Sequence, residues 1–145
     1  MIPKLLKKDA MKLDVLLQLD LYNRFFKKDT DKYSNVIKYF KKEAKNMPWD
    51  NWECYGIKNK ILLTVDKRKK DGATHIMDFF VSPKYRGKGL GTSFLKAIQE
   101  KYDKLYLNVF ARNKEAIKLY KKLGFKIEKE YDEKGEPCYL MNNYK

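Results

Sequence analysis

The sequence contains few of the residues on which several common catalytic sites depend. Its 145 residues include one histidine, His75, and two widely separated cysteines, Cys54 and Cys138. A single histidine leaves little for a three-ligand zinc site or a Ser-His-Asp triad. Two distant thiols are expected to be free rather than bridged. We therefore predict that the protein uses no metal, although a carboxylate-rich metal site stays open.

Long hydrophobic runs are also absent. No apolar stretch approaches the ~20 residues that a membrane-spanning helix needs. The first ten residues, MIPKLLKKDA, carry charge without a following apolar core, so they do not resemble a signal peptide. Hydrophobic residues nevertheless make up 43% of the chain and aromatic residues 14%, which argues against disorder. These features predict a folded cytoplasmic protein without a membrane partner.

Acidic residues are outnumbered and arginine is scarce. The net charge is +14, and 29 of the 33 basic residues are lysines. Proteins that read nucleic acids often use arginine for bidentate contacts, and the sequence shows no arginine-rich stripe or known binding motif. A lysine excess spread over the whole chain is more typical of a general compositional bias than of a dedicated binding surface. Nucleic acid is therefore the weaker reading of this charge, and it stays open as an alternative.

Hydrophobic periodicity indicates a mixed α/β domain with one central sheet. No internal repeat or low-complexity linker is present. The predicted elements, in chain order, are a strand at 2–7, helices at 9–27 and 31–45, strands at 52–57, 61–65 and 74–81, a helix to about 102, a strand at 105–110, a helix at 114–123, and a hairpin of 125–131 with 137–141.

The most informative segment is a glycine-rich turn between a strand and a helix, Val81-Ser-Pro-Lys-Tyr-Arg-Gly-Lys-Gly-Leu-Gly91. Glycines let the backbone approach a ligand closely, and the following helix adds the positive end of its dipole, so the turn is suited to a diphosphate. It is neither a Walker P-loop nor a good dinucleotide fingerprint. A tight turn without any ligand is the simpler alternative.

The same segment resembles the acetyl-CoA signature of the GNAT superfamily of N-acetyltransferases, Arg/Gln-x-x-Gly-x-Gly/Ala. A second segment, from Asn113 to Phe125, resembles the family's Asn-x-x-Ala-x-x-Leu-Tyr-x-x-x-Gly-Phe. The resemblance is close over about 76–125. It implies an α/β (α+β) fold, with a mixed, mostly antiparallel sheet flanked by helices. It also implies a single N-acetyltransferase domain over 1–145, with an acceptor-side half at about 1–73 and an acetyl-CoA half at about 74–145.

The resemblance assigns a role to each residue of the two motifs. It implies that acetyl-CoA is the co-substrate, that the strand backbone pairs with its pantetheine arm, and that the glycine turn holds its pyrophosphate. The implied cofactor-binding residues are Phe79, Val81, Arg86, Gly87, Lys88, Gly89, Leu90, Gly91, Thr92 and Asn113. Asn113 also stands where a helix N-cap belongs, and both roles can hold together. Many members of the family are dimers, so a homodimer is possible.

Tyr120 and Asp78 are the two predicted catalytic residues. Tyr120 matches the family tyrosine that protonates the departing thiolate, although a tyrosine on an apolar helix face can also be part of the core. Some relatives carry a glutamate where this chain has Asn108, which cannot accept a proton. Asp78 is then the nearest base, and Ile76 and Phe80 are expected on its own face, where they would raise its pKa. A water relay to a distant group stays open.

The leading reading is an N-acetyltransferase that acts on a small-molecule or protein amine. A nucleic-acid-binding protein and a catalytically idle CoA-sensing module are the alternatives. The net positive charge predicts that polycations such as spermine are disfavoured as acceptors. A cluster of the acidic residues from the first 60 positions in the cleft would reverse this preference.

Overall fold

A computed structural model describes residues 2–145 of the chain. None of the helices in this part is long and apolar enough to cross a membrane. The elements are α1 (Lys7–Leu21), the wide single turn η1 (Tyr22–Phe26), α2 (Tyr33–Lys45), η2 (Trp49–Asn51), β1 (Trp52–Ile57), β2 (Ile61–Asp66), β3 (Thr74–Val81), η3 (Pro83–Tyr85), α3 (Leu90–Lys101), β4 (Leu105–Phe110), α4 (Lys114–Lys122), β5 (Lys126–Glu133) and β6 (Glu136–Asn142).

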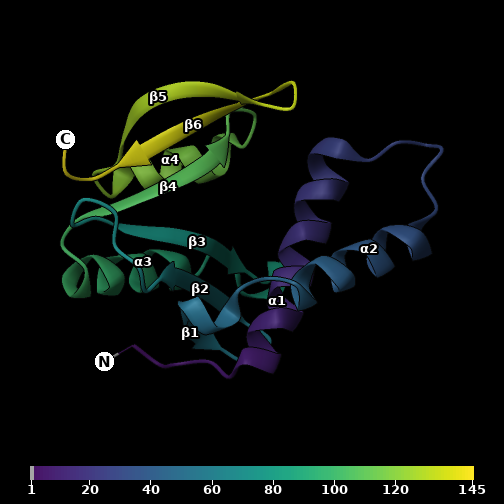
Figure 1. Cartoon of the computed structure of the whole chain (residues 1–145), viewed down its shortest axis with the longest axis horizontal. Coiled ribbons are helices and arrows are strands. Elements are labelled where there is room, and N and C mark those ends of the chain that lie inside the picture. Colours follow the sequence, from purple (N-terminus) through teal and green to yellow (C-terminus); the bar gives the residue numbers. More distant parts are fainter. Residues whose placement is uncertain (1) are drawn as a thin grey trace.

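The six strands form one sheet in the order β1-β2-β3-β4-β6-β5. All neighbours are antiparallel except β3 and β4, which run parallel. These two strands pair only at Thr74 with Leu105 and at His75 with Tyr106. Beyond this point they diverge, as Figure 1 shows between the teal and green arrows. The predicted fold class, a mixed and mostly antiparallel sheet flanked by helices, is confirmed.

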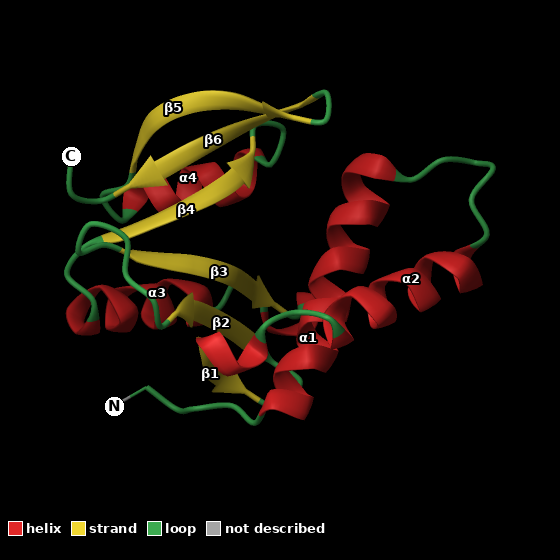
Figure 2. Cartoon of the chain, viewed as in Figure 1, coloured by secondary structure: helices red, strands yellow, loops and turns green. Residues whose placement is uncertain are grey.

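The helices cover the sheet unevenly, as Figure 2 shows, and two hydrophobic cores lie between the helices and the sheet. The larger core joins α3 and α4 to one face, with Leu95, Ile98, Leu107 and Phe125 fully enclosed. The smaller core lies under α1, on the opposite face of β1 to β3. α2 packs against α1 rather than against the sheet. One face of the sheet is therefore covered at β1 to β3, while the strands beyond the divergence remain open to a ligand.

Two predictions about the N-terminal segment are wrong. Residues 2–7 were expected to form a strand, but they contribute only an isolated bridge between Lys4 and Tyr55 before α1 begins. Leu13, Leu16, Leu17 and Leu21 recur at three- and four-residue spacings, which predicts one apolar helix face, but Leu16 is 46% exposed. Asp14 is buried instead, at 4% exposure, on the face that packs against the sheet.

Candidate active site

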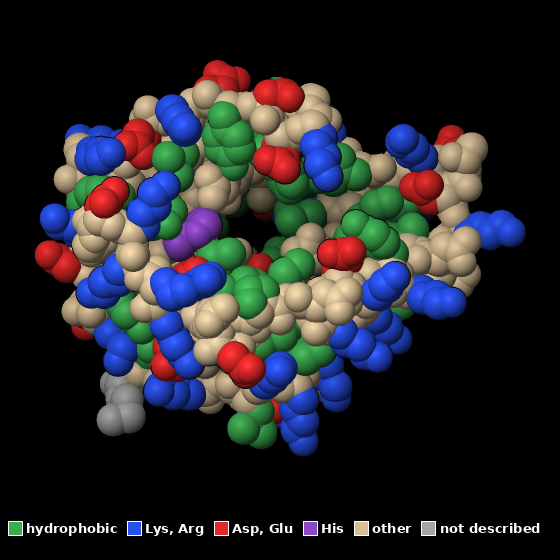
Figure 3. Space-filling view, in the orientation of Figure 1, with side chains coloured by type: hydrophobic (Ala, Val, Ile, Leu, Met, Phe, Trp, Pro, Cys, Tyr) green, Lys and Arg blue, Asp and Glu red, His purple; other side chains and the backbone are tan. Residues whose placement is uncertain are grey.

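A cleft with a volume of about 600 Å³ opens where β3 and β4 diverge. Residues from α1, β3, the glycine turn, β4 and α4 line it. Figure 3 shows a hollow in the middle of this face, rimmed by hydrophobic side chains, with most of the lysines and arginines farther out. The volume lies in the range of small-molecule sites, roughly 300–1,000 Å³. Every residue predicted from the sequence for the site lines this cleft except Lys88, which is exposed beside it.

The glycine turn presents a row of main-chain N–H groups to the cleft. Gly87 and Gly89 adopt left-handed conformations, with φ of 77° and 79°, and Gly89 is the residue that precedes α3. Outside the helices, no backbone hydrogen bond of residues 2–145 uses the N–H groups of residues 87–92. A Cβ at Gly91 would lie 3.3 Å from the side chains of Phe79 and Val81, so any larger residue here would have to push these side chains aside. The turn is therefore shaped to bind an anion at the start of α3.

The open edge of β3 carries main-chain groups next to this turn. Ser82 donates its N–H to Lys60 beside β2, at 2.8 Å. Because main-chain groups alternate along a strand, those of Phe79 and Val81 face the side of β4, where no strand pairs with them. The side chains of both residues pack against the larger core. The backbone of Phe79 is thus free to pair with an extended ligand arm, as the resemblance implies.

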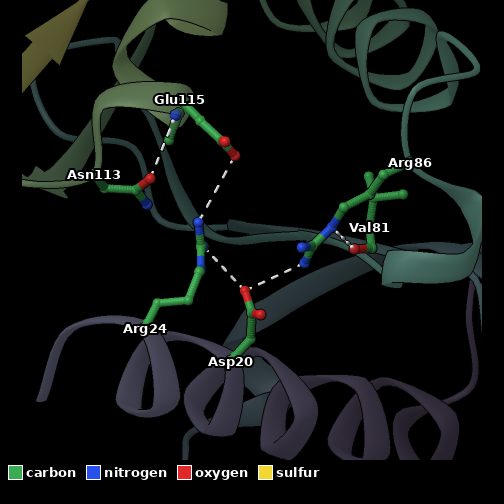
Figure 4. Close-up of polar contacts among 7 residues, drawn as sticks. Asp20, Arg24, Val81, Arg86, Asn113 and Glu115 are labelled. Atoms are coloured by element: carbon green, nitrogen blue, oxygen red, sulfur yellow. Dashed lines mark hydrogen bonds and ion pairs between the residues drawn. The ribbon is translucent and has the colours of Figure 1, made fainter. Parts of the chain in front are cut away.

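Arg86 does not extend freely toward the turn. Its Nε donates to the Val81 carbonyl at 2.8 Å, and its guanidinium pairs with Asp20 of α1 at 3.2 Å. Asp20 also pairs with Arg24 at 3.0 Å, and Arg24 reaches Glu115 of α4 at 3.8 Å. Figure 4 shows this chain of contacts, which connects α1 to both walls of the cleft. Arg86 therefore ties the turn to α1.

Asn113 is the N-cap of α4. Its Oδ1 accepts a hydrogen bond from the Ala116 N–H at 3.4 Å, so the predicted capping role is present (Figure 4). The side chain also lines the cleft, and its amide nitrogen is not used by the cap. At the other end of α4, Gly124 has a φ of 95°, and the N–H of Phe125 bonds the Tyr120 carbonyl at 2.9 Å. The two caps fix the helix that carries Tyr120.

Tyr120 lies between Phe79 of β3 and Phe125, with ring centroids 6.3 and 5.9 Å away. Its side chain is 8% exposed and lines the cleft. Burial raises the pKa of its phenol well above the ordinary value, and the hydroxyl has no hydrogen-bond partner among residues 2–145 that would offset this effect. The phenol is therefore held as a neutral proton donor inside the cleft.

Asp78 stands at an irregularity of β3. Ile76 pairs with Val65 while Asp78 pairs with Thr64, so Met77 is an extra residue in the strand. This bulge places Ile76 in the larger core, so it does not share the face of Asp78 as predicted, whereas Phe80 lies in the smaller core under α1, on the same face as Asp78. The Thr64 hydroxyl accepts the Asp78 N–H at 2.9 Å. The carboxyl group instead faces α1.

The carboxyl group of Asp14 on α1 is the principal neighbour of Asp78. Burial raises the pKa of Asp78 well above its usual range, and the adjacent Asp14 charge raises it further. Burial also raises the pKa of Asp14, while hydrogen bonds from Asp78 and Gln18 oppose this increase. Asp14 was not predicted from the sequence. The available signal was a charged residue within the apolar stripe of a helix.

The charge of the cleft is opposite to that of the molecule. Among residues 2–145, no lysine lines it, and its charged residues are four carboxyl groups and two arginines. Both arginines are paired with Asp20. Among the carboxyl groups, Asp78 and Glu133 form no ion pair in the described part of the chain. A cationic ligand would find an acidic lining here, despite the net charge of +14.

Several polar residues without an assigned role lie in or beside the cleft. Asn108, exposed on β4, has its amide 3.0 Å from Nε2 of His75, which stacks on Tyr106. Burial lowers the pKa of His75. Both cysteines are free, as predicted. Burial, assisted by the Asp78 charge, raises the pKa of the Cys54 thiol to about 11, so it is a poor nucleophile at neutral pH.

Known proteins resemble the chain both in sequence and in fold. A spermine/spermidine N(1)-acetyltransferase of Bacillus subtilis (strain 168) is 38% identical over 77 residues, which are 49% of this chain and 51% of the relative. An N-alpha-acetyltransferase of Sulfurisphaera tokodaii is 42% identical over 76 residues, 46% of each chain. The matches thus span about half the length of these relatives.

The PaiA N-acetyltransferase of Thermoplasma acidophilum, solved in complex with coenzyme A, superimposes with a TM-score of 0.73 at 13% identity, covering 99% of this chain and 97% of that one. This likeness shows the fold. The family model described as "Acetyltransferase (GNAT) family" matches residues 49–125, which include the glycine turn and the Asn113–Phe125 motif. The chain therefore belongs to the GNAT acetyltransferase family.

Proposed function

We propose that the protein transfers the acetyl group of acetyl-CoA to a primary amine, by direct attack of the amine on the thioester. The observation that supports this most is the row of unpaired N–H groups at the start of α3, which opens into a cleft holding a neutral tyrosine and a buried carboxyl group. The curated relatives carry N-acetyltransferase names, in agreement with this function.

Different residues of the chain would bind different parts of acetyl-CoA. The N–H groups from Gly87 to Thr92 would hold the diphosphate, and the free edge of β3 at Phe79 would pair with the pantetheine arm. Arg86 and Lys88 add positive charge beside the diphosphate, and the unused amide of Asn113 faces the same cleft. Acetyl-CoA supplies a thioester, so no acyl-enzyme is needed.

Two side chains would handle the protons. An alkylamine is mostly protonated at neutral pH, so a base must remove one proton before attack. Asp78 is the carboxyl group of the cleft that lies closest to a base's requirements, because it is half-buried, has a raised pKa and pairs with no cation among the described residues. Tyr120 would donate a proton to the sulfur as it leaves.

For the acceptor we propose an amine with more than one positive charge. The net charge of the molecule suggested the opposite preference, but the cleft itself is lined by carboxyl groups and by no lysine of residues 2–145. Local charge outweighs distant charge, because salt screens exposed charges beyond roughly 8–10 Å. The relative from Bacillus subtilis is a spermine/spermidine N(1)-acetyltransferase, which supports a polyamine-like acceptor.

The binding half of the proposal is tested with Gly89→Glu. Acetyl-CoA should raise the melting temperature of the unmodified protein, since a ligand that binds only the native state stabilises it. The added carboxylate at Gly89 should abolish this shift. Gly72→Glu is a matched control, because Gly72 has the same φ of 79° and equally open surroundings in a turn outside the cleft. Equal shifts in both folded variants would overturn the diphosphate assignment.

The catalytic half is tested with acceptors. Purified protein, acetyl-CoA and a panel of spermidine, an aminoglycoside, an amino acid amide and a peptide with a free N-terminus are analysed by mass spectrometry for an added acetyl group. Acetylated spermidine is the expected product. Acetyl-CoA binding without product from any acceptor would favour the CoA-sensing alternative, and salt-sensitive RNA binding without an acetyl-CoA effect would favour the nucleic-acid alternative.

A further inference from the structure

We infer that Asp14 and Asp78 form a single acid–base unit that holds one shared proton, binds the ammonium group of the acceptor and removes its proton. Asp78 is the member that lines the cleft, and Asp14 is the positioning residue behind it. This inference rests on the proposed acetyl transfer and adds to it a second carboxyl group, which comes from the acceptor-side half of the chain.

The shared proton follows from the contacts of Asp78. Its Oδ2 is fully buried, and no N–H or O–H group of residues 2–145 donates to it. Asp14 is buried on the face of α1 that packs against β3, where it is the neighbour that acts on the Asp78 carboxyl. Two ionised carboxylates only accept hydrogen bonds, so this contact is favourable only when one proton lies between them.

The surroundings of the pair keep that proton in place. Thr64 accepts the main-chain N–H of Asp78, and Gln18 donates to Asp14. The titratable neighbour on β1 is the Cys54 thiol, which is neutral at physiological pH. No lysine or arginine of the described residues forms an ion pair with either carboxyl group. With no internal cation to offset it, the single negative charge is available to a ligand.

The two carboxyl groups differ in a way that assigns the proton. Burial of its carboxyl group raises the pKa of Asp78, and the charge of Asp14 adds to the increase. Asp14 gains hydrogen bonds from Asp78 and Gln18, which oppose the increase caused by its own burial. At neutral pH the stable arrangement is therefore protonated Asp78 beside ionised Asp14, as in carboxyl pairs that cannot both ionise.

The proton transfer balances as follows. The ammonium group of the acceptor gives one proton to Asp78, while the proton that Asp78 held moves to Asp14. The acceptor becomes a neutral amine, and the pair becomes fully protonated. The amine nitrogen then forms its bond to the acetyl carbon, the carbon–sulfur bond breaks, and the second nitrogen proton ends on the thiol through Tyr120. The pair afterwards releases one proton to water.

Each member of the pair has its own expected signature when it is replaced. Asp78→Asn removes the group that meets the acceptor, so kcat should fall by about a hundredfold, within the range of acid–base groups. Asp14→Asn leaves Asp78 able to accept a proton. In the unmodified protein the first ionisation of the pair is favoured because the remaining proton is shared, whereas in the variant Asp78 must ionise alone. The acidic limb of the kcat/KM profile should therefore move to higher pH, with a loss of about tenfold for each unit of that shift on the limb.

The experiment compares Asp14→Asn, Asp78→Asn and the double variant by kcat, KM and pH profile, with acetyl-CoA affinity measured separately by calorimetry. Asp9→Asn is the matched control, because Asp9 is a buried carboxyl group on the same helix that does not line the cleft. We expect an unchanged acetyl-CoA affinity in every variant and a double variant no slower than Asp78→Asn, since residues of one unit are not additive. An unmoved acidic limb in Asp14→Asn would overturn the inference.

A titration keeps the inference testable apart from turnover. Carbon-13 NMR of labelled aspartate should show that Asp78 keeps its proton to a higher pH in the unmodified protein than in Asp14→Asn, because the variant lacks the charge that opposes ionisation. An unchanged Asp78 midpoint would refute the shared proton even in the absence of a known acceptor. A moved midpoint without any acetylated product would instead retain the pair and refute the proposed reaction.

Discussion

Tyr120 can act as a packing residue of the core and as a hydrogen-bond donor to a ligand, and its position distinguishes these two roles. The ring packs between Phe79 and Phe125 and contributes to the core, while the hydroxyl lacks a protein partner among the described residues. A hydroxyl that served only the core would be expected to have a protein partner, whereas this one lines the cleft and is not among the fully enclosed unpaired atoms of the described residues. Its free hydroxyl is better explained by a partner that arrives with the ligand.

Replacing Tyr120 by Phe should therefore reduce turnover but not stability. The ring contacts are retained and an unpaired hydroxyl is removed, so the melting temperature should stay within a few degrees or rise. kcat should fall by ten- to a thousandfold, near the range of acid–base groups, with little change in acetyl-CoA affinity. Steady-state kinetics and thermal melts check this, with Tyr102→Phe as a control outside the cleft. Full activity would leave Tyr120 as a core residue only.

Asp78 carries a stability cost that depends on pH. Its pKa is raised in the folded state, so its folded form favours the bound proton more than the unfolded form does. Such a group stabilises the protein below the unfolded pKa, and this stability is lost as the pH rises toward the folded pKa. Asparagine mimics the protonated acid at every pH and avoids that loss.

Asp78→Asn should accordingly melt at a higher temperature than the unmodified protein at pH 8. The difference should shrink as the pH falls toward about 4, near the ordinary pKa of aspartate. Thermal melts between pH 4 and pH 8 measure it. A difference of constant size over this range would mean that the substitution acts through packing and not through the proton. A difference that grows with pH would show that the protein gives up stability in order to keep an ionisable carboxyl group in its cleft.

At the level of elements, the sequence was most informative where a run of strand- or helix-forming residues was followed by clear turn residues. The strands at 52–57, 74–81 and 105–110 have the predicted bounds, because each is a run of strand-forming residues that ends at a turn or a proline. The segment at 2–7 has the composition of a strand but only one bridge to β1, since main-chain pairing depends on a partner that local sequence does not show.

The site could be predicted only in part, because local sequence patterns do not show which distant segments meet. The glycine turn and the α4 motif are local patterns, and the structure brings them to one cleft. Asp14, the ion pair of Arg86 with Asp20, and the bulge at Met77 all depend on how α1 lies across β3. The sequence could not supply this placement. A charged residue in the buried stripe of a helix was the one available sign of it.

The bulge itself gives a prediction for the element. Thr64 of β2 accepts the Asp78 N–H that regular pairing would have used, so its hydroxyl holds the bulge. Thr64→Val should lower the free energy of unfolding by about 1–3 kcal/mol, the cost of a buried unpaired donor. It should also reduce kcat, because Asp78 loses its orientation, with acetyl-CoA affinity unchanged.

Thr74→Val provides the comparison for this change. Thr74 is similarly buried on β3, and its hydroxyl has no side-chain hydrogen bond among the described residues. Denaturant melts and kinetics of both variants therefore separate the bulge contact from a general effect of threonine in the sheet. A fall in kcat that is equal in the two variants would remove Thr64 from the positioning of Asp78.

At the scale of the whole molecule, charge is separated between the outer surface and the cleft. The chain has a net charge of +14, and most of its blue side chains lie away from the central hollow in Figure 3. The cleft has Asp78 and Glu133 without ion-pair partners among residues 2–145. A polycationic acceptor is thus repelled at long range and attracted at short range, and ionic strength acts differently on the two effects.

Salt should therefore help a polycationic acceptor to react. The long-range repulsion between exposed lysines and the acceptor is screened at moderate ionic strength, while the attraction inside the cleft is screened less. With saturating acetyl-CoA, kcat/KM for spermidine should rise between about 20 and 150 mM salt, where the Debye length falls to roughly 8 Å. Butylamine, with one charge, should change less.

Glu133→Gln should reduce the preference for spermidine over butylamine, whereas Glu130→Gln, exposed on the same strand but outside the cleft, should not. A steady fall of kcat/KM for spermidine with salt would show that the outer charge does not oppose its approach, and equal effects of the two glutamine variants would show that the cleft's own charge does not select the acceptor.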